Sequence, residues 1–527
     1  MMNKKENSGF TLIELLAVIV ILAIVAIIAV PSVINVIEDA RKGSFKNSVY
    51  GIIKAAEYNH ALKTIKDSNP GEIKYTYANG KESSTQDDYK LEYKGQKPKD
   101  GTIVINEEGQ VSLALHDGTY CVEKGYSDSE VTLTTKTTDE CKIATDAFLP
   151  SLGEGMIPIK WDGSKWIKAD INSKWYDYDA KEWANVVLVT EATRNTYKNA
   201  SAGTSITEAD VLAYLVWIPR YRYKLFNVGA TVMSAQTIEI EFEDKNTPKA
   251  TGSTNGTWLT HPAFTFGSDE LTGFWVGKFE TTGNATRPTV KPGVASLRSQ
   301  SVSNQFATAQ KFNTQVTYGL PSTYDAHMMK NMEWGAVTYL SHSKYGKNAE
   351  IWKNPSSGNI TGCAGTSVSP GSSSGCSYHY TTSNGQQAST TGNVYGIYDM
   401  SGGAYDRVMG GMYNSGNTTI MLSGSGFAQA TIDGAGMEKY IDKYTYGTTY
   451  NDQIAINRRK LGDATGETRR WYSDSANFVY PSYPWFYRGD YYGAGAGAGA
   501  FNFSYYSGGS SIYTGFRLAV SGGNVSA

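Results

Sequence analysis

Cysteine and histidine are scarce in this chain of 527 residues, which has four of the first and six of the second. Neither residue type occurs at the spacing of a zinc site, and no histidine pair has the H-E-x-x-H arrangement of a zinc-dependent protease. Net charge is scarce as well, because 48 lysines and arginines nearly balance 50 acidic residues. A net charge of -2 excludes the basic footprint of nucleic-acid binding, and no nucleic-acid partner is expected.

Apolar and aromatic residues are not scarce, since 40% of the chain is hydrophobic and 12% is aromatic. This composition excludes an intrinsically disordered chain, and the length predicts two to four domains. The composition is biased toward 37 tyrosines, 55 glycines and 11 tryptophans. Tyrosine and tryptophan provide rigid amphipathic contact area at a low entropic cost, so the bias favours a binding surface.

An uninterrupted apolar run lies near the N-terminus, where residues 15–30 contain no polar side chain. Counted from Phe10, the segment is long enough to cross a bilayer as one helix, and Lys4 and Lys5 precede it. A cleaved signal peptide or a plain single-pass anchor is the simpler interpretation of such a run. Glu14 argues against both, because a charged group at the centre of a membrane helix costs roughly 2.5 to 3.5 kcal/mol on insertion scales. Glu14 therefore predicts a specific partner.

The stretch Gly9-Phe10-Thr11-Leu12-Ile13-Glu14, followed by the apolar run, resembles the N-terminus of type IV prepilins and pseudopilins. The resemblance implies that a prepilin peptidase cleaves between Gly9 and Phe10 and that the new amine of Phe10 is methylated. It also implies that Glu14 pairs with the N-terminal amine of a neighbouring pilin subunit, which lowers the desolvation cost of both charges. Pro31 stands where many pilins have a proline that loosens the helix.

The chain is predicted to have an α+β fold in five segments. Residues 1–9 form the leader, 10–65 the transmembrane and assembly helix, and 66–148 a pilin head with a small antiparallel sheet. Alternating patterns predict strands at 73–77, 89–93, 102–105 and 110–115. A tryptophan-rich segment at 149–190 is predicted to be a linker of short hairpins, followed by a large domain at 191–527.

The four cysteines form two pairs that are each close in sequence. In an exported protein this indicates local disulfides, and we expect Cys121 to pair with Cys141 and Cys363 with Cys376. The two crossed connectivities are the alternatives.

Four segments of the C-terminal part occur in the order seen in formylglycine-generating-enzyme-like domains, at 274–280, 332–336, 393–403 and 515–519. The resemblance spans roughly residues 156–520 and implies a variant of the C-type lectin fold. Those enzymes use a pair of cysteines just upstream of the last motif, whereas residues 487–514 contain no cysteine. We therefore expect the fold without the activity, and no catalytic residues. The alternative is a membrane-tethered enzyme of this sulfatase-modifying type.

Other catalytic and cation-binding signals are weak. Residues 371–375 fit the G-x-S-x-G pattern, but they lie in a Ser/Gly-rich stretch without the strand and helix of a nucleophile elbow. Glu280 and Asp399 could each bind a cation such as calcium in a lectin-like fold. The simpler interpretation is that both are buried carboxylates that accept backbone hydrogen bonds. No cofactor is predicted, and a calcium site is left open.

The segment 485–519 is crowded with tyrosine, glycine, serine and alanine. It resembles the C-terminal region of the variable proteins of diversity-generating retroelements, in which selected positions are rewritten while the backbone is kept. The resemblance implies a ligand-binding surface formed by Trp485, Arg488, Asp490, Tyr491, Tyr492, Tyr505, Tyr506, Ser507, Ser510, Ser511 and Tyr513. The alternative is an ordinary pair of Tyr/Gly-rich loops without hypervariability.

These features predict a minor or tip pilin that acts as an adhesin on the bacterial cell surface or an extracellular pilus. Before assembly it would cross the inner or cytoplasmic membrane once. Its expected partners are other pilin subunits, the prepilin peptidase, the membrane and an unknown extracellular protein or glycan.

Overall fold

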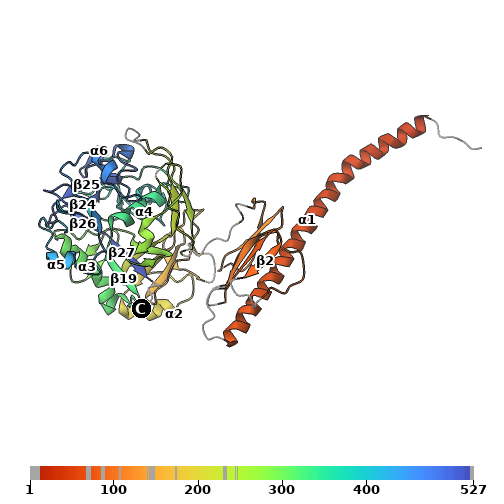
Figure 1. The fold of residues 1–527 in the computed structure, drawn as a ribbon, viewed down its shortest axis with the longest axis horizontal. Coiled ribbons are helices and arrows are strands. Elements are labelled where there is room, and N and C mark those ends of the chain that lie inside the picture. Colours follow the sequence, from red (N-terminus) through yellow and green to blue (C-terminus); the bar gives the residue numbers. More distant parts are fainter. Residues whose placement is uncertain are drawn as a thin grey trace, which may run out of the picture. The chain divides into compact units, whose positions relative to one another are not determined.

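The computed structural model describes residues 12–66, 73–84, 90–105, 109–126, 128–138, 141, 149–171, 175–228, 234–243, 245, 247–253 and 255–522. Side chains at 14, 22, 25–32 and 452–453 are outside the description. The chain divides into two compact units, Met1–Ala144 and Thr145–Ala527 (Figure 1). Each unit has a hydrophobic core of its own. Both units are built as expected for an α+β protein.

Unit 1 consists of one long helix and one antiparallel sheet. Helix α1, Leu12–Lys66, ends where the sequence predicts, before the Asp-Ser-Asn-Pro-Gly breaker. The sheet has the order β2-β1-β3-β4-β5-β6. Its strands are β1 Ile73–Ala78, β2 Lys81–Ser84, β3 Asp100–Ile105, β4 Val111–His116, β5 Cys121–Lys124 and β6 Thr132–Thr134.

The C-terminal half of α1 supplies one face of the unit 1 core. Phe45, Val49 and Ile52 recur at helical spacing and are fully buried with Ile103 and Leu113 of the sheet. Large apolar side chains nearer the N-terminus of α1, such as Leu16 and Ile37, are exposed. The amphipathic part of the sequence therefore corresponds to the half of α1 that packs against the sheet.

One expectation for unit 1 is not met by the described residues. Residues 90–93 form no strand; the carbonyl oxygen of Lys90 instead accepts a hydrogen bond from Asn59 of α1, and Leu91 donates to Glu82.

The expected membrane span over 10–30 lies partly outside the description. In the described part of the chain no helix combines the length and apolarity of a membrane crossing.

Unit 2 contains a seven-stranded antiparallel sheet of order β19-β27-β16-β10-β9-β7-β8. Its strands are β7 Met156–Trp161, β8 Trp166–Lys168, β9 Asn185–Val189, β10 Val211–Pro219, β16 Gly273–Gly277, β19 Tyr324–Met328 and β27 Leu518–Gly522. The last strand of the chain thus lies between strands that precede it by about two hundred residues or more.

The tryptophan-rich segment is not a linker. Its described residues supply β7, β8 and β9, and Trp166, Trp175 and Trp183 are buried in the core of unit 2. The indole nitrogen of Trp183 donates to the backbone oxygen of Tyr345 at 2.8 Å. These aromatic hairpins become part of the large sheet because they pair with strands outside this segment of the sequence. The local pattern did not indicate this pairing.

A second sheet of unit 2 carries the C-terminal segment. It has the order β23-β22-β24-β25, and β26 pairs with β22. Its strands are β22 Tyr405–Met412, β23 Asp442–Tyr444, β24 Trp485–Gly489, β25 Gly499–Tyr506 and β26 Thr514–Phe516.

Short elements complete unit 2. The helices are α2 Glu191–Asn199, α3 Val302–Thr314, α4 Asn331–Ser341, α5 Gln429–Ile432 and α6 Asp452–Arg458. The remaining strands are β11 Tyr221–Lys224, β12 Glu239–Phe242, β13 Leu259–Thr260, β14 Thr265–Phe266, β15 Asp269–Glu270, β17 Thr282–Gly283, β18 Pro288–Thr289, β20 Cys363–Ala364 and β21 Tyr378–His379. Every residue of α4 is buried, and the indole of Trp334 donates to Ala500 at 2.8 Å, which ties this helix to β25.

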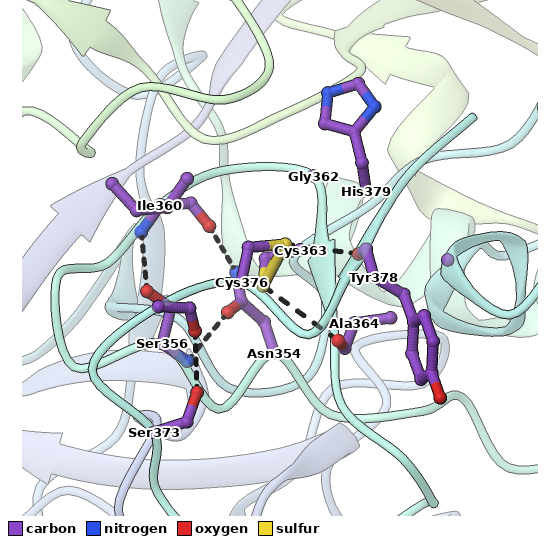
Figure 2. Close-up of a disulfide and its surroundings, with 12 residues drawn as sticks. Asn354, Ser356, Ile360, Gly362, Cys363, Ala364, Ser373, Cys376, Tyr378 and His379 are labelled. Atoms are coloured by element: carbon purple, nitrogen blue, oxygen red, sulfur yellow. Dashed lines mark hydrogen bonds between the residues drawn. A yellow bond between two sulfur atoms is a disulfide. The ribbon is translucent and has the colours of Figure 1, made fainter. Parts of the chain in front are cut away.

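Both predicted disulfides are present. Cys121 of β5 is bonded to Cys141, with 5.6 Å between their Cα atoms. In unit 2, Cys363 of β20 is bonded to Cys376, and Figure 2 shows this bond beside Asn354, which donates to the backbone oxygen of Ile360. The second disulfide closes the Ser/Gly-rich loop that contains residues 371–375, so these residues form a loop and no nucleophile elbow.

Candidate functional site

The β24–β25 hairpin places tyrosines on both faces of an edge of the second sheet. Tyr505 pairs with Phe486 and Tyr506 with Trp485, so the two tyrosines point to opposite faces of β25. Tyr483 contacts both, with ring centroids 5.5 Å from Tyr505 and 6.4 Å from Tyr506. Tyr483 therefore connects the tyrosines on the two faces of β25.

Ring-to-ring contacts extend from this hairpin into one connected set, which we call the tyrosine band. Its members are Tyr405, Tyr450, Tyr480, Tyr483, Tyr487, Tyr491, Tyr492, Tyr505, Tyr506 and Tyr513. All ten are half-buried or exposed, so each offers part of its ring to solvent.

Tyr405 is the centre of one half of the tyrosine band. Its ring centroid lies 4.1 Å from that of Tyr487 and 4.9 Å from that of Tyr491, which is stacked on it. Tyr491 in turn contacts Tyr492 at 5.1 Å and Tyr513 at 5.7 Å. Contacts of this kind immobilise the rings before any ligand arrives, which lowers the entropy lost on binding.

The loop that follows β25 presents small and apolar side chains beside the band. Ser510 and Tyr513 are exposed, Ser507 and Ser511 are half-buried, and Ile512 is 60% exposed. The backbone of this loop is held from outside: Ser299 donates to Ser511 at 3.0 Å, and the guanidinium of Arg407 donates to Gly509 at 2.8 Å.

The exposed surface of residues 487–519 has no formal charge. This fully described segment contains three charged side chains, Arg488, Asp490 and Arg517, and none is more than 7% exposed. A ligand that contacts this segment would therefore meet the phenol groups of tyrosines, the hydroxyls of serines, methyl groups and backbone atoms of the segment.

Arg488 is an internal residue. Its guanidinium donates to Asn331 Oδ1, to the backbone oxygens of Asp463 and Ala464, and to the backbone oxygen of Asn502, at 2.7–2.9 Å. Burial lowers the pKa of Arg488 to about 10, although nearby acidic groups counteract this effect. The hydrogen bonds of Arg488 connect β24 to α4 and to the turn at residues 463–464.

Asp490 is buried beneath the tyrosine band. Its carboxylate accepts from the backbone nitrogen of Tyr491 at 2.9 Å and from the side chain of Asn502 at 3.1 Å. Burial raises the pKa of Asp490 to about 6, against hydrogen bonds from Tyr491, Tyr405 and Asn502 that lower it. Its φ of 58° is left-handed, a conformation that aspartate tolerates better than most residues.

The structure therefore divides the predicted binding residues. Tyr491, Tyr492, Tyr505, Tyr506, Ser507, Ser510, Ser511 and Tyr513 reach the surface and lie together. Trp485, Arg488 and Asp490 do not, and the direct ligand contact predicted for these three is corrected, because each is enclosed by core or hydrogen-bonding partners.

Sequence reasoning missed five members of the tyrosine band. Tyr487 lies within the predicted segment but was not named among its binding residues. Tyr405 lies on β22, and Tyr450, Tyr480 and Tyr483 precede the predicted segment. Tyr405 follows directly on the motif at 393–403, which is the one local signal that could have pointed to it. Nothing in the local pattern marks the other three.

Three of the four motif segments, at 274–280, 393–403 and 515–519, are joined by hydrogen bonds within the core. Arg517 forms an ion pair with Asp406 at 2.8 Å and donates to the backbone oxygen of Gly277 at 3.0 Å. Lys278 donates to the backbone oxygens of Val394 and Gly396 at 2.7 and 2.8 Å. These motifs have a structural role, because their polar side chains form hydrogen bonds and ion pairs within the core.

Glu280 and Asp399 accept internal hydrogen bonds, as the simpler interpretation expects. Asp399 accepts from Asn354 at 2.9 Å and Gly362 at 3.0 Å, while Glu280 accepts from Ala404 at 3.0 Å. Burial raises the pKa of both carboxyl groups, that of Asp399 to about 6 despite the opposing charge of Arg517. Among the residues that the structure describes, no group of three or more histidine, cysteine, aspartate or glutamate side chains is placed to hold a metal ion.

The predicted processing and assembly residues are outside this description. Gly9 and Phe10 lie before the first described residue, and for Glu14 and Pro31 only the helical backbone of α1 is described.

Comparison with known proteins bears on the N-terminus alone. Residues 4–30 match the prokaryotic N-terminal methylation motif. No curated protein matches the chain. The matched residues include Gly9, Phe10 and Glu14, so the chain begins with a type IV prepilin-like N-terminus.

Proposed function

We propose that this protein is a minor or tip pilin that uses the tyrosine band to bind a ligand outside the cell. The observation that carries the proposal is the band itself: ten tyrosines form one connected set, and six of them belong to residues 487–519, where all three charged side chains are internal. Recognition surfaces are often rich in tyrosines whose rings are fixed before binding and that are surrounded by small residues.

The N-terminal motif supports the pilin part of the proposal. Cleavage before Phe10 would make Glu14 the fifth residue of the mature chain, where its carboxylate would pair with the amine of a neighbouring subunit. The large apolar side chains of α1 that are described between Leu12 and Ile24 and between Val33 and Ile37 are exposed in the single chain. Packing against the helices of other subunits would remove them from water.

A lectin-like fold with rewritten surface positions is the finer form of the proposal. The division of residues 485–519 into internal anchors and surface positions supports it, because the surface tyrosines and serines could change without removing a core contact. Trp485, Arg488 and Arg517 would stay constant, and Tyr491, Ser510 and Tyr513 would vary. The DNA beside the gene tests this form: it should contain a reverse transcriptase and a near-copy of the codons for 485–519 that differs at adenines.

Binding is preferred over catalysis of the formylglycine-generating type. The chain has four cysteines, and all of them are in the two disulfides, which leaves no thiol for that chemistry. Incubation of the purified chain with a cysteine-containing sulfatase peptide tests the alternative, since conversion of that cysteine to formylglycine would contradict our proposal.

The binding proposal is tested with the labelled full chain on a saccharide array and on intact bacterial and animal cells. We expect saturable binding to at least one of these surfaces, with loss of most of it when Tyr491 and Tyr513 are both changed to serine. Tyr58→Ser is the matched control, because Tyr58 is 64% exposed on α1 and belongs to unit 1. Absence of binding everywhere, or full binding by the double variant, would refute the proposal.

A further inference from the structure

One large aliphatic side chain is exposed in the loop that joins β25 to β26. Ile512 is 60% exposed, more than any other isoleucine or leucine that the structure describes in unit 2. It directly precedes Tyr513, whose ring contacts that of Tyr491 in the tyrosine band. From this position we infer that the ligand of the tyrosine band is a folded protein, which binds Ile512 in an apolar pocket of its own surface. The inference rests on the proposed function and names the class of partner.

The backbone around Ile512 is fixed by hydrogen bonds. The guanidinium of Arg298 donates to the backbone oxygen of Ile512, and the backbone nitrogen of Tyr405 donates to that of Tyr513 at 2.8 Å. Within the loop, the backbone nitrogen of Tyr513 donates to the hydroxyl of Ser511 at 3.2 Å. Ile512 is therefore presented in one position before a partner arrives, so little backbone entropy is lost on binding.

The side chain of Ile512 offers a ligand apolar contact alone. A saccharide has hydroxyls on most of its ring carbons, and enclosing Ile512 with them would leave those hydroxyls without hydrogen-bond partners. A pocket on a protein is lined mainly by apolar and aromatic side chains, which enclose an isoleucine without that cost. Full burial of an exposed isoleucine is worth roughly ten- to hundredfold in affinity. Ile512 therefore favours a protein over a saccharide.

The side chains best suited to sugar hydroxyls are internal in this segment. Carboxylate, amide and guanidinium groups can each form two hydrogen bonds to adjacent hydroxyls. Residues 487–519 contain one amide side chain, that of Asn502, which is fully buried and donates to Asp490 at 3.1 Å and to the backbone oxygen of Gly497 at 3.0 Å. Asp490 and the two arginines of the segment are internal as well. A tyrosine-rich surface without charge has instead the composition of the centre of a protein–protein interface.

Exposed apolar side chains occur along the whole tyrosine band. Nine large hydrophobic side chains of unit 2 are exposed among the described residues, and four of them lie in the band or directly beside it: Tyr450, Tyr483, Ile512 and Tyr513. Tyr450 and Tyr483 contact Tyr505, whereas Tyr513 contacts Tyr491, so both halves of the band contribute. Apolar groups spread over a surface of this kind are typical of protein-binding sites.

The experiment measures binding of the labelled full chain to the cell type that binds it best, after two treatments of the cells. Proteinase K removes surface proteins, and sodium periodate cleaves the vicinal diols of glycans. We expect proteinase K to abolish most of the saturable binding and periodate to leave it unchanged. Loss of binding after periodate, survival of binding after proteinase K, or binding to the saccharide array alone would overturn the inference and leave the proposed function standing.

Ile512→Ser is the decisive variant. We expect it to weaken cell binding about tenfold or more and to leave the unfolding temperature unchanged, because the side chain is exposed. Ile512→Val keeps most of the apolar surface and should lose less affinity than Ile512→Ser. Ile171→Ser is the matched control, which should bind as the wild type does, because Ile171 is 52% exposed in unit 2 and lies outside the band and its loop. Binding by Ile512→Ser equal to that of the wild type would contradict the inference.

The Tyr491→Ser, Tyr513→Ser double variant separates this inference from the proposed function. Loss of cell binding in the double variant, together with full binding by Ile512→Ser, would keep the tyrosine band as the binding site and overturn the protein pocket for Ile512. Full binding by the double variant, or absence of binding to every surface, would refute the proposed function and this inference with it.

Discussion

The Nε2 atom of His327 lies 3.0 Å from Oε1 of Glu333, and both side chains are fully buried. On its other side His327 faces Asp325, which also forms an ion pair with Lys439. Burial lowers the pKa of His327, but Glu333 and Asp325 outweigh burial and raise that pKa to about 9. The folded state therefore holds a histidinium that an unfolded chain would lose near its ordinary pKa of about 6.5.

This relationship predicts a loss of stability in base. A group whose pKa is raised on folding contributes its full stabilisation below about pH 6.5, and that contribution is lost as the pH rises through about 9. The free energy of unfolding of unit 2 should fall by about 3 kcal/mol between pH 6 and pH 10, measured by denaturant titration. His327→Gln should flatten this dependence; an equally steep curve in the variant would contradict the assignment.

Asp490 predicts a pH dependence of the same sign as His327, but in a more acidic range. Its pKa of about 6 in the folded state exceeds the ordinary value of about 3.9, so the folded protein takes up this proton first. Unit 2 should gain stability from this group as the pH falls from 7 to about 4. Asp490→Asn, compared with wild type at pH 7 and pH 5, should remove that part of the gain, and an unchanged increment would refute the assignment.

Anchors and surface positions of the C-terminal segment should differ in their effect on stability. Arg488→Ala leaves the carbonyl groups of Asp463, Ala464 and Asn502 without their donor and should destabilise unit 2 by at least about 3 kcal/mol. Tyr513→Ser, at a side chain that is 42% exposed, should cost about 0.5 kcal/mol or less. Thermal unfolding measures both, and similar losses would show that the division into anchors and surface positions is incorrect.

The two units should respond separately to loss of a disulfide. Changing both Cys121 and Cys141 to serine opens a loop with a sequence separation of 20, and should destabilise unit 1 by about 3 kcal/mol. Because each unit has its own core, calorimetry should show one transition shifted and the transition of unit 2 unmoved. A common shift of both transitions would argue against independent cores.

Glu14→Ala should separate processing from assembly. Under the proposed function, cleavage after Gly9 should not need the carboxylate, whereas pairing with the amine of the next subunit should need it. We expect mature protein of normal length in the membrane fraction and little or none in sheared filaments, detected by immunoblot. Glu14→Gln serves as a test of charge, and filament incorporation equal to wild type in both variants would contradict the pilin proposal.

Local patterns in the sequence predicted what depends on near neighbours. The end of α1 at Lys66, the strands around Ile73, Ile103 and Leu113, and both disulfides follow from periodicity, breakers and short spacing, and all are confirmed. These features need few partners from elsewhere in the chain.

Features that depend on distant partners could not be predicted in this way. Trp183, just before β9, belongs to the core because Tyr345 and the strands of unit 2 enclose it. Arg488 is internal because Asn331 and the 463–464 turn accept its hydrogen bonds. The tyrosine band joins Tyr405 to Tyr491 across more than eighty residues. The composition indicated that tyrosines would matter, but their arrangement required the fold.

The absence of exposed charge on residues 487–519 determines how a ligand would arrive there. Because no charged side chain of this segment is exposed, the segment itself should contribute little electrostatic steering, so association with it should proceed near an unassisted rate, about 10⁵–10⁶ per molar per second, with a weak dependence on ionic strength. Attachment would then change little between dilute and concentrated salt. Its strength would be set by how long the contact lasts after collision.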